Sequence, residues 1–376
     1  MFLAIRELAF KRGRFVIMGA VIALIAILTV LLSGLSVGLR KDGVSGLESM
    51  DVTTYAFQEN VSEGSAFSRS VVNIDAVDVW KQQPGVAEAA PFGNTLVNGR
   101  SSHGVEVDLA LFGIEQGSFI EPDVAEGSPV TSKGQVVISP TAADEGIGIG
   151  DVITLDPAGI DLEVVGILSG QHTFGHVDVG YISLETWQEV SAGVRPGDSV
   201  PAHVYQDITA VAVKSDGSGE FDMAAGDAAA GTTSIRKVDS YDASPGYSAE
   251  TATLDLIQMF LYGISALVVG AFFTVLTIQR QPEIAVMRAM GAGTGYLVRD
   301  GLAQSLILLL ISGGVGVASG LAAGLAITST PMPFAIEYGQ VFLAMTLLLV
   351  LGLIGAVVAI VRITRVDPLT ALGGSR

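Results

Sequence analysis

The stretch TIQRQPEIAVMRAMG, residues 277–291, decides how the rest of this sequence is organised. A long apolar run ends here, two arginines appear, and a short helical pattern begins at a proline. Pro282 suits the first turn of a helix, Glu283 suits its positive end, and Gly291 suits its C-terminal cap. Apolar runs of membrane length lie on both sides, so we expect a short helix at a membrane surface.

Composition predicts an integral membrane protein with one acidic soluble domain. Mean hydropathy is +0.55 and 49% of the 376 residues are apolar, which is too apolar for a soluble protein. The formal net charge is −18, yet residues 41–250 alone hold 32 acidic and 9 basic residues. Cysteine is absent, which excludes disulfide bonds and thiolate metal sites. We expect no nucleic-acid partner.

Four apolar runs define the predicted fold class. It is an α-helical membrane protein with four transmembrane helices and a mixed α/β extracytoplasmic domain inserted between helices 1 and 2. The first run has 25 uncharged residues, enough for a bilayer core of about 30 Å and too long for a cleaved signal peptide. The expected segments are an interfacial helix at 1–14, helix 1 at 15–39, a two-lobed α/β domain at 40–250, helix 2 at 256–278, a cytoplasmic helix and loop at 279–300, helix 3 at 302–327, helix 4 at 341–361 and a tail at 362–376.

Basic residues near the spans predict the orientation. Net charges are +3 for residues 1–14, +1 for 279–300 and +2 for 362–376. Basic segments close to a span stay in the cytoplasm, so both termini are expected there and the acidic domain outside. The predicted location is the plasma membrane, with the lipid bilayer as an obligatory partner.

Glycines in the third span predict close helix packing. Gly316, Gly320 and Gly324 recur at four-residue intervals, which allows another backbone to approach closely. The fourth span, which carries Gly352 and Gly355, is the expected neighbour. Packing within the fold is favoured over a conduction path.

The order of spans and three short motifs resemble the FtsX/MacB-type permeases of ABC transporters. The segment EIAVMRAMGA, residues 283–292, is similar to that family's cytoplasmic coupling helix, and the ending from Arg362 to Leu372 is similar to its tail. The pattern Gly113-Ile114, Val136 to Ser139, Ile149 to Asp151 and Val165 to Ile167 looks like the core domain of MacB-like permeases.

The resemblance implies partners for this chain. A cytoplasmic ABC ATPase would receive the coupling residues Glu283, Ile284, Met287, Arg288 and Met290, and a second copy would complete a homodimer. Simple cover for the helix bundle is the alternative role for this helix. The chain has no GxxxxGK[ST] motif, so we expect it not to be an enzyme, with no catalytic residues, and ATP and Mg²⁺ to be bound by the partner.

Within the family, the chain most resembles the haem-exporter permeases of Gram-positive bacteria. That resemblance implies haem as a transported substrate and no intrinsic cofactor. Haem would need an apolar slot with an axial ligand, for which Glu250, Met259, Phe260 and Tyr262 are candidates. Packing or an interfacial aromatic belt is the alternative for these residues. His172 and His176 have metal-pair spacing, but Gly175 predicts a surface loop, so no metal site is expected.

Three functions stay open at this point. The first is export of haem or a similar amphipathic molecule. The second is an FtsX-like mechanotransmitter that activates an extracytoplasmic cell-wall hydrolase, and the third is export of a lipoprotein or peptide.

Overall fold

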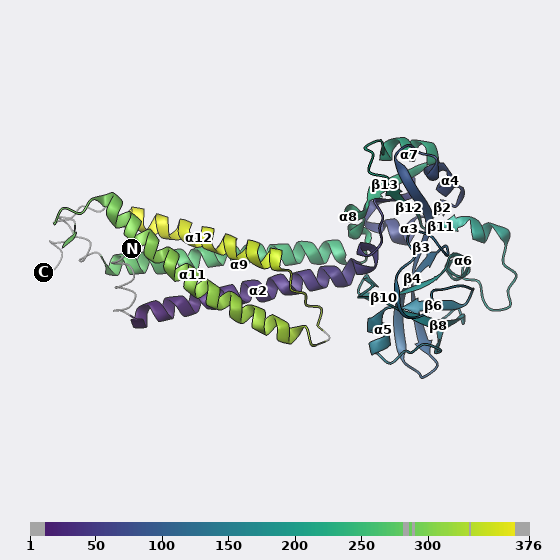
Figure 1. Cartoon of the computed structure of the whole chain (residues 1–376), viewed down its shortest axis with the longest axis horizontal. Coiled ribbons are helices and arrows are strands. Elements are labelled where there is room, and N and C mark those ends of the chain that lie inside the picture. Colours follow the sequence, from purple (N-terminus) through teal and green to yellow (C-terminus); the bar gives the residue numbers. More distant parts are fainter. Residues whose placement is uncertain (1–11, 281–285, 288–289, 331, 365–376) are drawn as a thin grey trace. The chain divides into compact units, whose positions relative to one another are not determined.

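The computed structural model describes residues 12–280, 286–287, 290–330 and 332–364 (Figure 1). They divide into a helical unit, within Met1–Leu39 and Ala252–Arg376, and an α/β unit, Arg40–Thr251. The predicted fold class is confirmed, since an α/β domain is inserted after the first of four membrane-length apolar helices. Most of the expected interfacial helix at 1–14 and of the tail at 362–376 lies outside the described residues.

Four long helices make up the described part of the helical unit, and two of them continue along the chain into the α/β unit. They are helical because a bilayer core offers no water to satisfy backbone groups, and apolar over most of their length because their side chains face hydrocarbon. Their bounds are α2 (Arg12–Glu48), α9 (Tyr247–Gln279), α11 (Thr294–Ile327) and α12 (Tyr338–Thr364).

The glycine stripe of α11 packs on a different neighbour from the one predicted. A Cβ on Gly316 would lie 2.5 Å from the Ala23 carbonyl oxygen, and one on Gly320 would lie 2.9 Å from Cβ of Val30, both on α2. A Cβ on Gly324 would lie 2.9 Å from the Phe334 ring. The prediction that these glycines pack against the fourth helix is therefore wrong. Glycine spacing shows where another backbone can approach a helix, but not which backbone does so.

The glycines of α12 serve other contacts. A Cβ on Gly355 would lie 3.0 Å from Cα of Gly270 on α9, and one on Gly352 would lie 3.0 Å from the Leu309 side chain on α11. Between these close approaches the described helices bury an apolar core that includes Ile22, Phe273 and Ala356. All four helices thus contribute to one bundle.

An eleven-stranded mixed sheet forms the α/β unit, with the main strand order β13-β1-β12-β3-β4-β10-β6-β8-β5. β7 pairs with β3 and β8, β9 pairs with β10, and β2 pairs with β11 in a separate ribbon. The strands are β1 (Thr54–Gln58), β2 (Val72–Asn73), β3 (Val86–Ser101), β4 (Glu106–Ile114), β5 (Val124–Gly127), β6 (Gln135–Ile138), β7 (Val152–Asp156), β8 (Asp161–Leu168), β9 (Thr173–Phe174), β10 (Val177–Ser183), β11 (Asp207–Ile208), β12 (Ala210–Ser215) and β13 (Thr232–Arg236).

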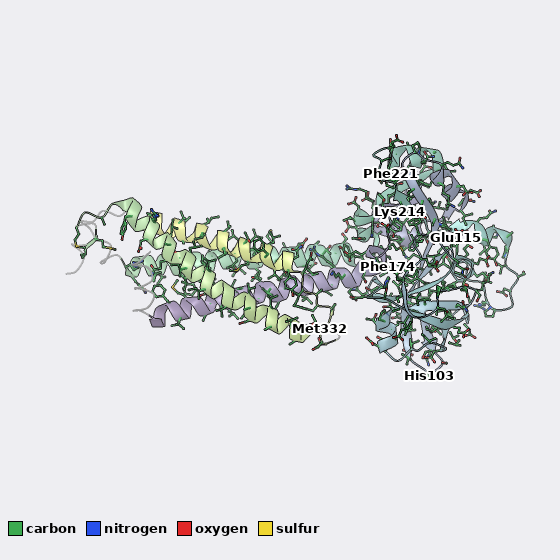
Figure 2. All side chains as sticks on the ribbon, in the orientation of Figure 1. His103, Glu115, Phe174, Lys214, Phe221 and Met332 are labelled. Atoms are coloured by element: carbon green, nitrogen blue, oxygen red, sulfur yellow. The ribbon has the colours of Figure 1, made fainter. Side chains whose placement is uncertain are left out.

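Short helices cover the sheet and its ends. In Figure 1, α4 and α7 lie with β12 and β13 at one end, and α5 lies with β6 and β8 at the other. Figure 2 correspondingly places Phe221, just before α7, and His103, in the β3–β4 turn, at opposite ends of this unit. The helices are η1 (Glu63–Ser65), α3 (Ala66–Arg69), α4 (Asp75–Lys81), α5 (Pro140–Asp144), α6 (Leu184–Ser191), η2 (Ala202–Gln206), α7 (Met223–Ala230), α8 (Lys237–Ser240) and η3 (Tyr241–Ala243).

Alternation along the strands creates two cores, one on each face of the sheet. In β1, Tyr55 and Phe57 join one buried cluster while Ala56 joins the other. The long strand β3 pairs with β12, β4 and β7, so a single sheet runs through the region that the sequence divides into two lobes. The two hydrophobic clusters are accordingly separated by the sheet itself.

Local signals explain where several helices begin and end. Asp222 caps α7 by accepting from the N–H groups of Ala224 and Ala225, and Gly231 ends it with a φ of 65°. Lys237 donates to the carbonyl oxygen of Glu48, the last residue of α2, at 2.8 Å and to that of Met50, two residues further on. A cation at this end complements the helix dipole, so α2 stops where the α/β unit supplies the charge.

Candidate functional site

A histidine held between two carboxylates lies where α2 and α9 meet the α/β unit along the chain. We call Asp42, His176 and Glu250 the histidine–carboxylate cluster. Nδ1 of His176 lies 2.9 Å from Oδ2 of Asp42, and Nε2 lies 2.8 Å from Oε2 of Glu250. Only an imidazolium donates from both nitrogens, so this geometry suits the charged ring. All three residues belong to the α/β unit.

Backbone geometry holds His176 in place. It lies between β9 and β10 with a φ of 65°, next to Gly175 with a φ of 61°. The N–H of Gly175 donates to the Gly43 carbonyl at 2.9 Å, and the Ser244 hydroxyl donates to the same carbonyl at 2.8 Å. The turn therefore joins the end of α2 to the approach to α9. His176 lies in a loop, as the sequence predicts, but no local pattern indicates its two acidic partners.

His172 is buried, which corrects the expectation of a surface loop for this residue. Its Nε2 lies 3.2 Å from the Ser169 carbonyl oxygen, which can only accept, so Nε2 carries the hydrogen. Nδ1 lies 3.2 Å from the Ser49 hydroxyl, which itself donates to the Gly46 carbonyl at 2.9 Å. Burial lowers the pKa of His172 below its usual value, with the Ser169 contact opposing the shift. The ring is thus a neutral part of the packing at the end of α2.

The candidate haem ligands are divided between the two units. Glu250 belongs to the histidine–carboxylate cluster, whereas Met259, Phe260 and Tyr262 lie on α9 within the helical unit. Met259 is 60% exposed and Phe260 is 59% exposed. With Leu256, Ile264 and Leu267 they make up an open apolar face of α9.

That face suits contact with lipid, another protein copy or an apolar ligand. Residues 256, 260, 264 and 267 follow helical spacing, so their side chains lie on one side of α9. Gly263 leaves space beside them, since nothing lies within 4 Å of a Cβ placed there. The Met259 thioether lies at the edge of this face, whereas Tyr262 lies on another side of α9 and is only partly exposed. Both groups are possible iron ligands.

A buried polar cluster joins the adjoining ends of α9 and α11. Arg280 follows the last turn of α9, and its Nη1 donates to Oε1 of Gln304 at 2.5 Å. Arg280, Gln304, Ser305 and Asp300 are all buried within the helical unit. Buried charges at the membrane surface are costly unless compensated, so this cluster constrains how the two helix ends meet. This cluster was not predicted, although the i, i+4 spacing of Asp300 and Gln304 on one face of α11 is a signal for it.

The predicted coupling helix follows shortly after Arg280 in the chain. Glu283, Ile284 and Arg288 lie outside the described residues, while Met287 and Met290 lie within them. The N–H of Met290 donates to the Val286 carbonyl at 3.0 Å, and Gly291 follows with a φ of 96°. A helical turn therefore ends at a glycine, as the sequence predicts. Met290 is 76% exposed and presents an unpartnered apolar side chain among the described residues.

Comparison with known families covers both units. The family description of the MacB-like periplasmic core domain matches residues 15–230, and that of the FtsX-like permease C-terminal domain matches residues 256–368. The chain belongs to the FtsX/MacB family of ABC transporter permeases. As such a permease it is a plasma-membrane protein with an extracellular α/β domain, and its family implies a cytoplasmic ATPase partner.

Full-length relatives include hemin transport permeases. The permease is 27% identical to a hemin transport system permease protein, HrtB, of Staphylococcus epidermidis, with 100% of this chain and 99% of the relative covered. It is 24% identical to the HrtB of Staphylococcus haemolyticus, covering 99% of each chain. It is also 24% identical to an ABC transporter permease of Mycobacterium tuberculosis, covering 100% of this chain and 99% of the relative.

Solved structures of extracellular domains are similar over about half of the permease. The extracellular domain of the ABC-type transporter YknZ from Gram-positive bacteria is 16% identical with a TM-score of 0.36, covering 49% of this chain and 98% of that one. The periplasmic region of MacB from Actinobacillus actinomycetemcomitans is 13% identical with a TM-score of 0.36, covering 51% of this chain and 92% of that one.

Proposed function

We propose that this permease exports haem or a similar amphipathic molecule from the membrane, using ATP and Mg²⁺ bound by a separate cytoplasmic ATPase. The observation that carries the proposal is the open apolar face of α9, on which Met259 and Phe260 are exposed. The full-length similarity to proteins named as hemin transport permeases supports the choice of haem.

The proposed haem contacts are Met259, Phe260 and Tyr262. Phe260 offers a flat apolar surface to the macrocycle, while the Met259 sulfur or the Tyr262 hydroxyl offers an axial ligand. Glu250 is not proposed as a haem ligand, because its carboxylate already contacts Nε2 of His176 at 2.8 Å. It belongs to the α/β unit with His176 and is not among the proposed haem contacts.

Two permease copies and two ATPases make up the proposed assembly, with both termini in the cytoplasm. A single four-helix bundle encloses little space, and α9 and α12 each leave a row of large apolar side chains exposed within the helical unit. A second copy could cover part of these rows and leave a lateral opening for the cargo. The exposed Met290 side chain, with Met287, is the proposed seat of the ATPase.

Absorbance spectroscopy tests the haem proposal directly. The permease would be purified with its ATPase in lipid nanodiscs and titrated with haemin, recording the Soret band and the ATPase rate. We expect a saturable spectral shift that Met259→Ala or Phe260→Ala weakens. Leu325→Ala, at a similarly exposed position on α11, is the matched control and should leave the titration unchanged. A titration without a saturable shift would refute haem as cargo and leave the family assignment intact.

A mechanotransmitter is the second candidate function. It is favoured by α2 and α9, which continue unbroken across the chain boundary between the units, and by Ser244, shortly before α9, which donates to the Gly43 carbonyl of α2. Continuous helices of this kind transmit displacement with little loss. Stimulation of a cell-wall hydrolase by the ATP-driven complex, with no response to haemin, would favour this function over export.

A further inference from the structure

A cavity of about 440 Å³ lies within the α/β unit, beside the middle of β3. Its volume falls in the range of about 300–1,000 Å³ that is typical of small-ligand sites. Apolar side chains from separate elements line it, among them Phe67 of α3, Trp187 of α6 and Phe174 of β9, which is labelled in Figure 2. None of the three proposed haem contacts contributes to it.

The cavity coincides with a gap in the sheet along one side of β3. β12 reaches only to Phe92, which pairs with Ala210, and β7 begins its pairing at Asn98, opposite Asp156. Neither strand pairs with Leu96, which lies between these two points. β3 therefore presents a short open edge although it is an interior strand of the sheet.

Backbone alternation shows which groups face this gap. The Phe92 carbonyl accepts from the Thr209 N–H at 3.0 Å, and the Asn94 N–H donates to Oγ1 of Thr209 at 2.9 Å. Because backbone groups alternate sides along a strand, the N–H and C=O of Leu96 face the same side. They form an unoccupied donor and acceptor pair of the kind that an added strand uses.

Exposed apolar side chains gather at the same place. Across the described α/β unit, the exposed large apolar residues are Val71, Leu96, Ile149 and Val238, and the first two line the cavity. Val71 and Leu96 can cover an apolar side chain of a ligand. Two such residues are far too few for a protein–protein interface of about 800 Å² on each partner, which favours a small ligand over a docked protein.

We propose that this cavity binds a free peptide of about three residues in extended conformation. Its central residue pairs with the N–H and C=O of Leu96 as an added strand. An apolar side chain of the peptide packs against Val71 and Leu96. The proposal is independent of haem export, since it uses only residues of the α/β unit.

The test uses the full-length permease in nanodiscs and the capped tripeptide acetyl-Ala-Leu-Ala-amide. Trp80→Phe leaves Trp187 as the sole tryptophan, so its fluorescence reports binding. We expect a saturable fluorescence change and at least about tenfold slower amide exchange at Leu96 when the peptide is present. Methylation of the leucine nitrogen in the peptide removes one pairing hydrogen bond and should weaken binding about tenfold, equivalent to about 1.4 kcal/mol.

Two variants separate binding from folding. Val71→Ser removes an apolar contact with the peptide and should weaken binding, and because Val71 is 55% exposed its stability should not fall. Ile149→Ser, at an exposed site outside the cavity, should bind the peptide like the parent. The proposal is overturned if the N-methylated peptide binds as tightly as the parent peptide, if exchange at Leu96 is unchanged at saturation, or if only a folded protein and no tripeptide binds.

Discussion

Replacing Met290 with aspartate should detach the permease from its ATPase without unfolding it. Met290 is 76% exposed and follows the helical turn that begins at Val286, so a charge there meets solvent in the isolated permease. In the complex the same side chain would lie in an apolar groove of the ATPase. Burying a methionine contributes about 1.5–3 kcal/mol, and each 1.4 kcal/mol corresponds to about a tenfold change in affinity.

The expected loss is therefore at least about tenfold to a hundredfold in affinity, and more because the carboxylate must also be desolvated. Copurification of the tagged permease with its ATPase, quantified by titration in nanodiscs, measures this loss. Met290→Leu keeps the apolar contact and should retain affinity. Tyr296→Asp places the same charge at an exposed position of α11 and serves as the matched control.

Normal affinity of Met290→Asp would refute the reasoning and make this stretch cover for the bundle. An equal loss with Tyr296→Asp would also refute it, because the effect would then follow local charge and not the apolar contact. Retained thermal stability of both variants is required for either conclusion. Their exposure in the described structure predicts that stability is retained.

Three further predictions concern packing, pH and coupling. Gly316→Leu should destabilise the helical unit by about 1–3 kcal/mol, measured by thermal unfolding in nanodiscs, whereas Gly314→Leu should not, because nothing lies within 4 Å of a Cβ on Gly314. Burial lowers the pKa of His172, so the unfolded chain takes up its proton first as pH falls. The stability contributed by the neutral ring should be complete above about pH 6.5 and decline below it, as followed by tryptophan fluorescence, and His172→Gln should flatten that decline. Arg280→Met should lower the export-coupled ATPase rate by breaking the contact with Gln304, and normal coupling would show that the buried cluster is only structural.

Much of the site could be predicted because its signals are local. The coupling stretch is marked by a proline, a glycine and a change from apolar to charged residues within fifteen positions. The exposed face of α9 follows from helical spacing alone. In contrast, Asp42, His176 and Glu250 are separated by 134 and 74 positions, so nothing in the local sequence could pair them.

The cavity beside β3 could not be predicted either, because it also depends on elements that are far apart in the chain. The residues at 135–139, 151–155 and 162–168 form strand-like apolar runs, and the structure has β6, β7 and β8 there. Which strand neighbours which cannot be read from alternation, since alternation fixes only the face that each side chain occupies. The gap at Leu96 arises where β12 ends and β7 begins, and both are distant in sequence from β3.

Hydropathy and charge along the chain determined the four membrane helices, the inserted acidic domain and the break at residues 277–291. These properties act over a helix turn or a bilayer thickness, so a single sequence carries them. Tertiary structure alone decided that the α11 glycines face α2, that Glu250 meets His176, and that Arg280 meets Gln304. Such contacts depend on which surfaces meet after the helices and strands have formed, and side-chain packing over long chain separations selects them.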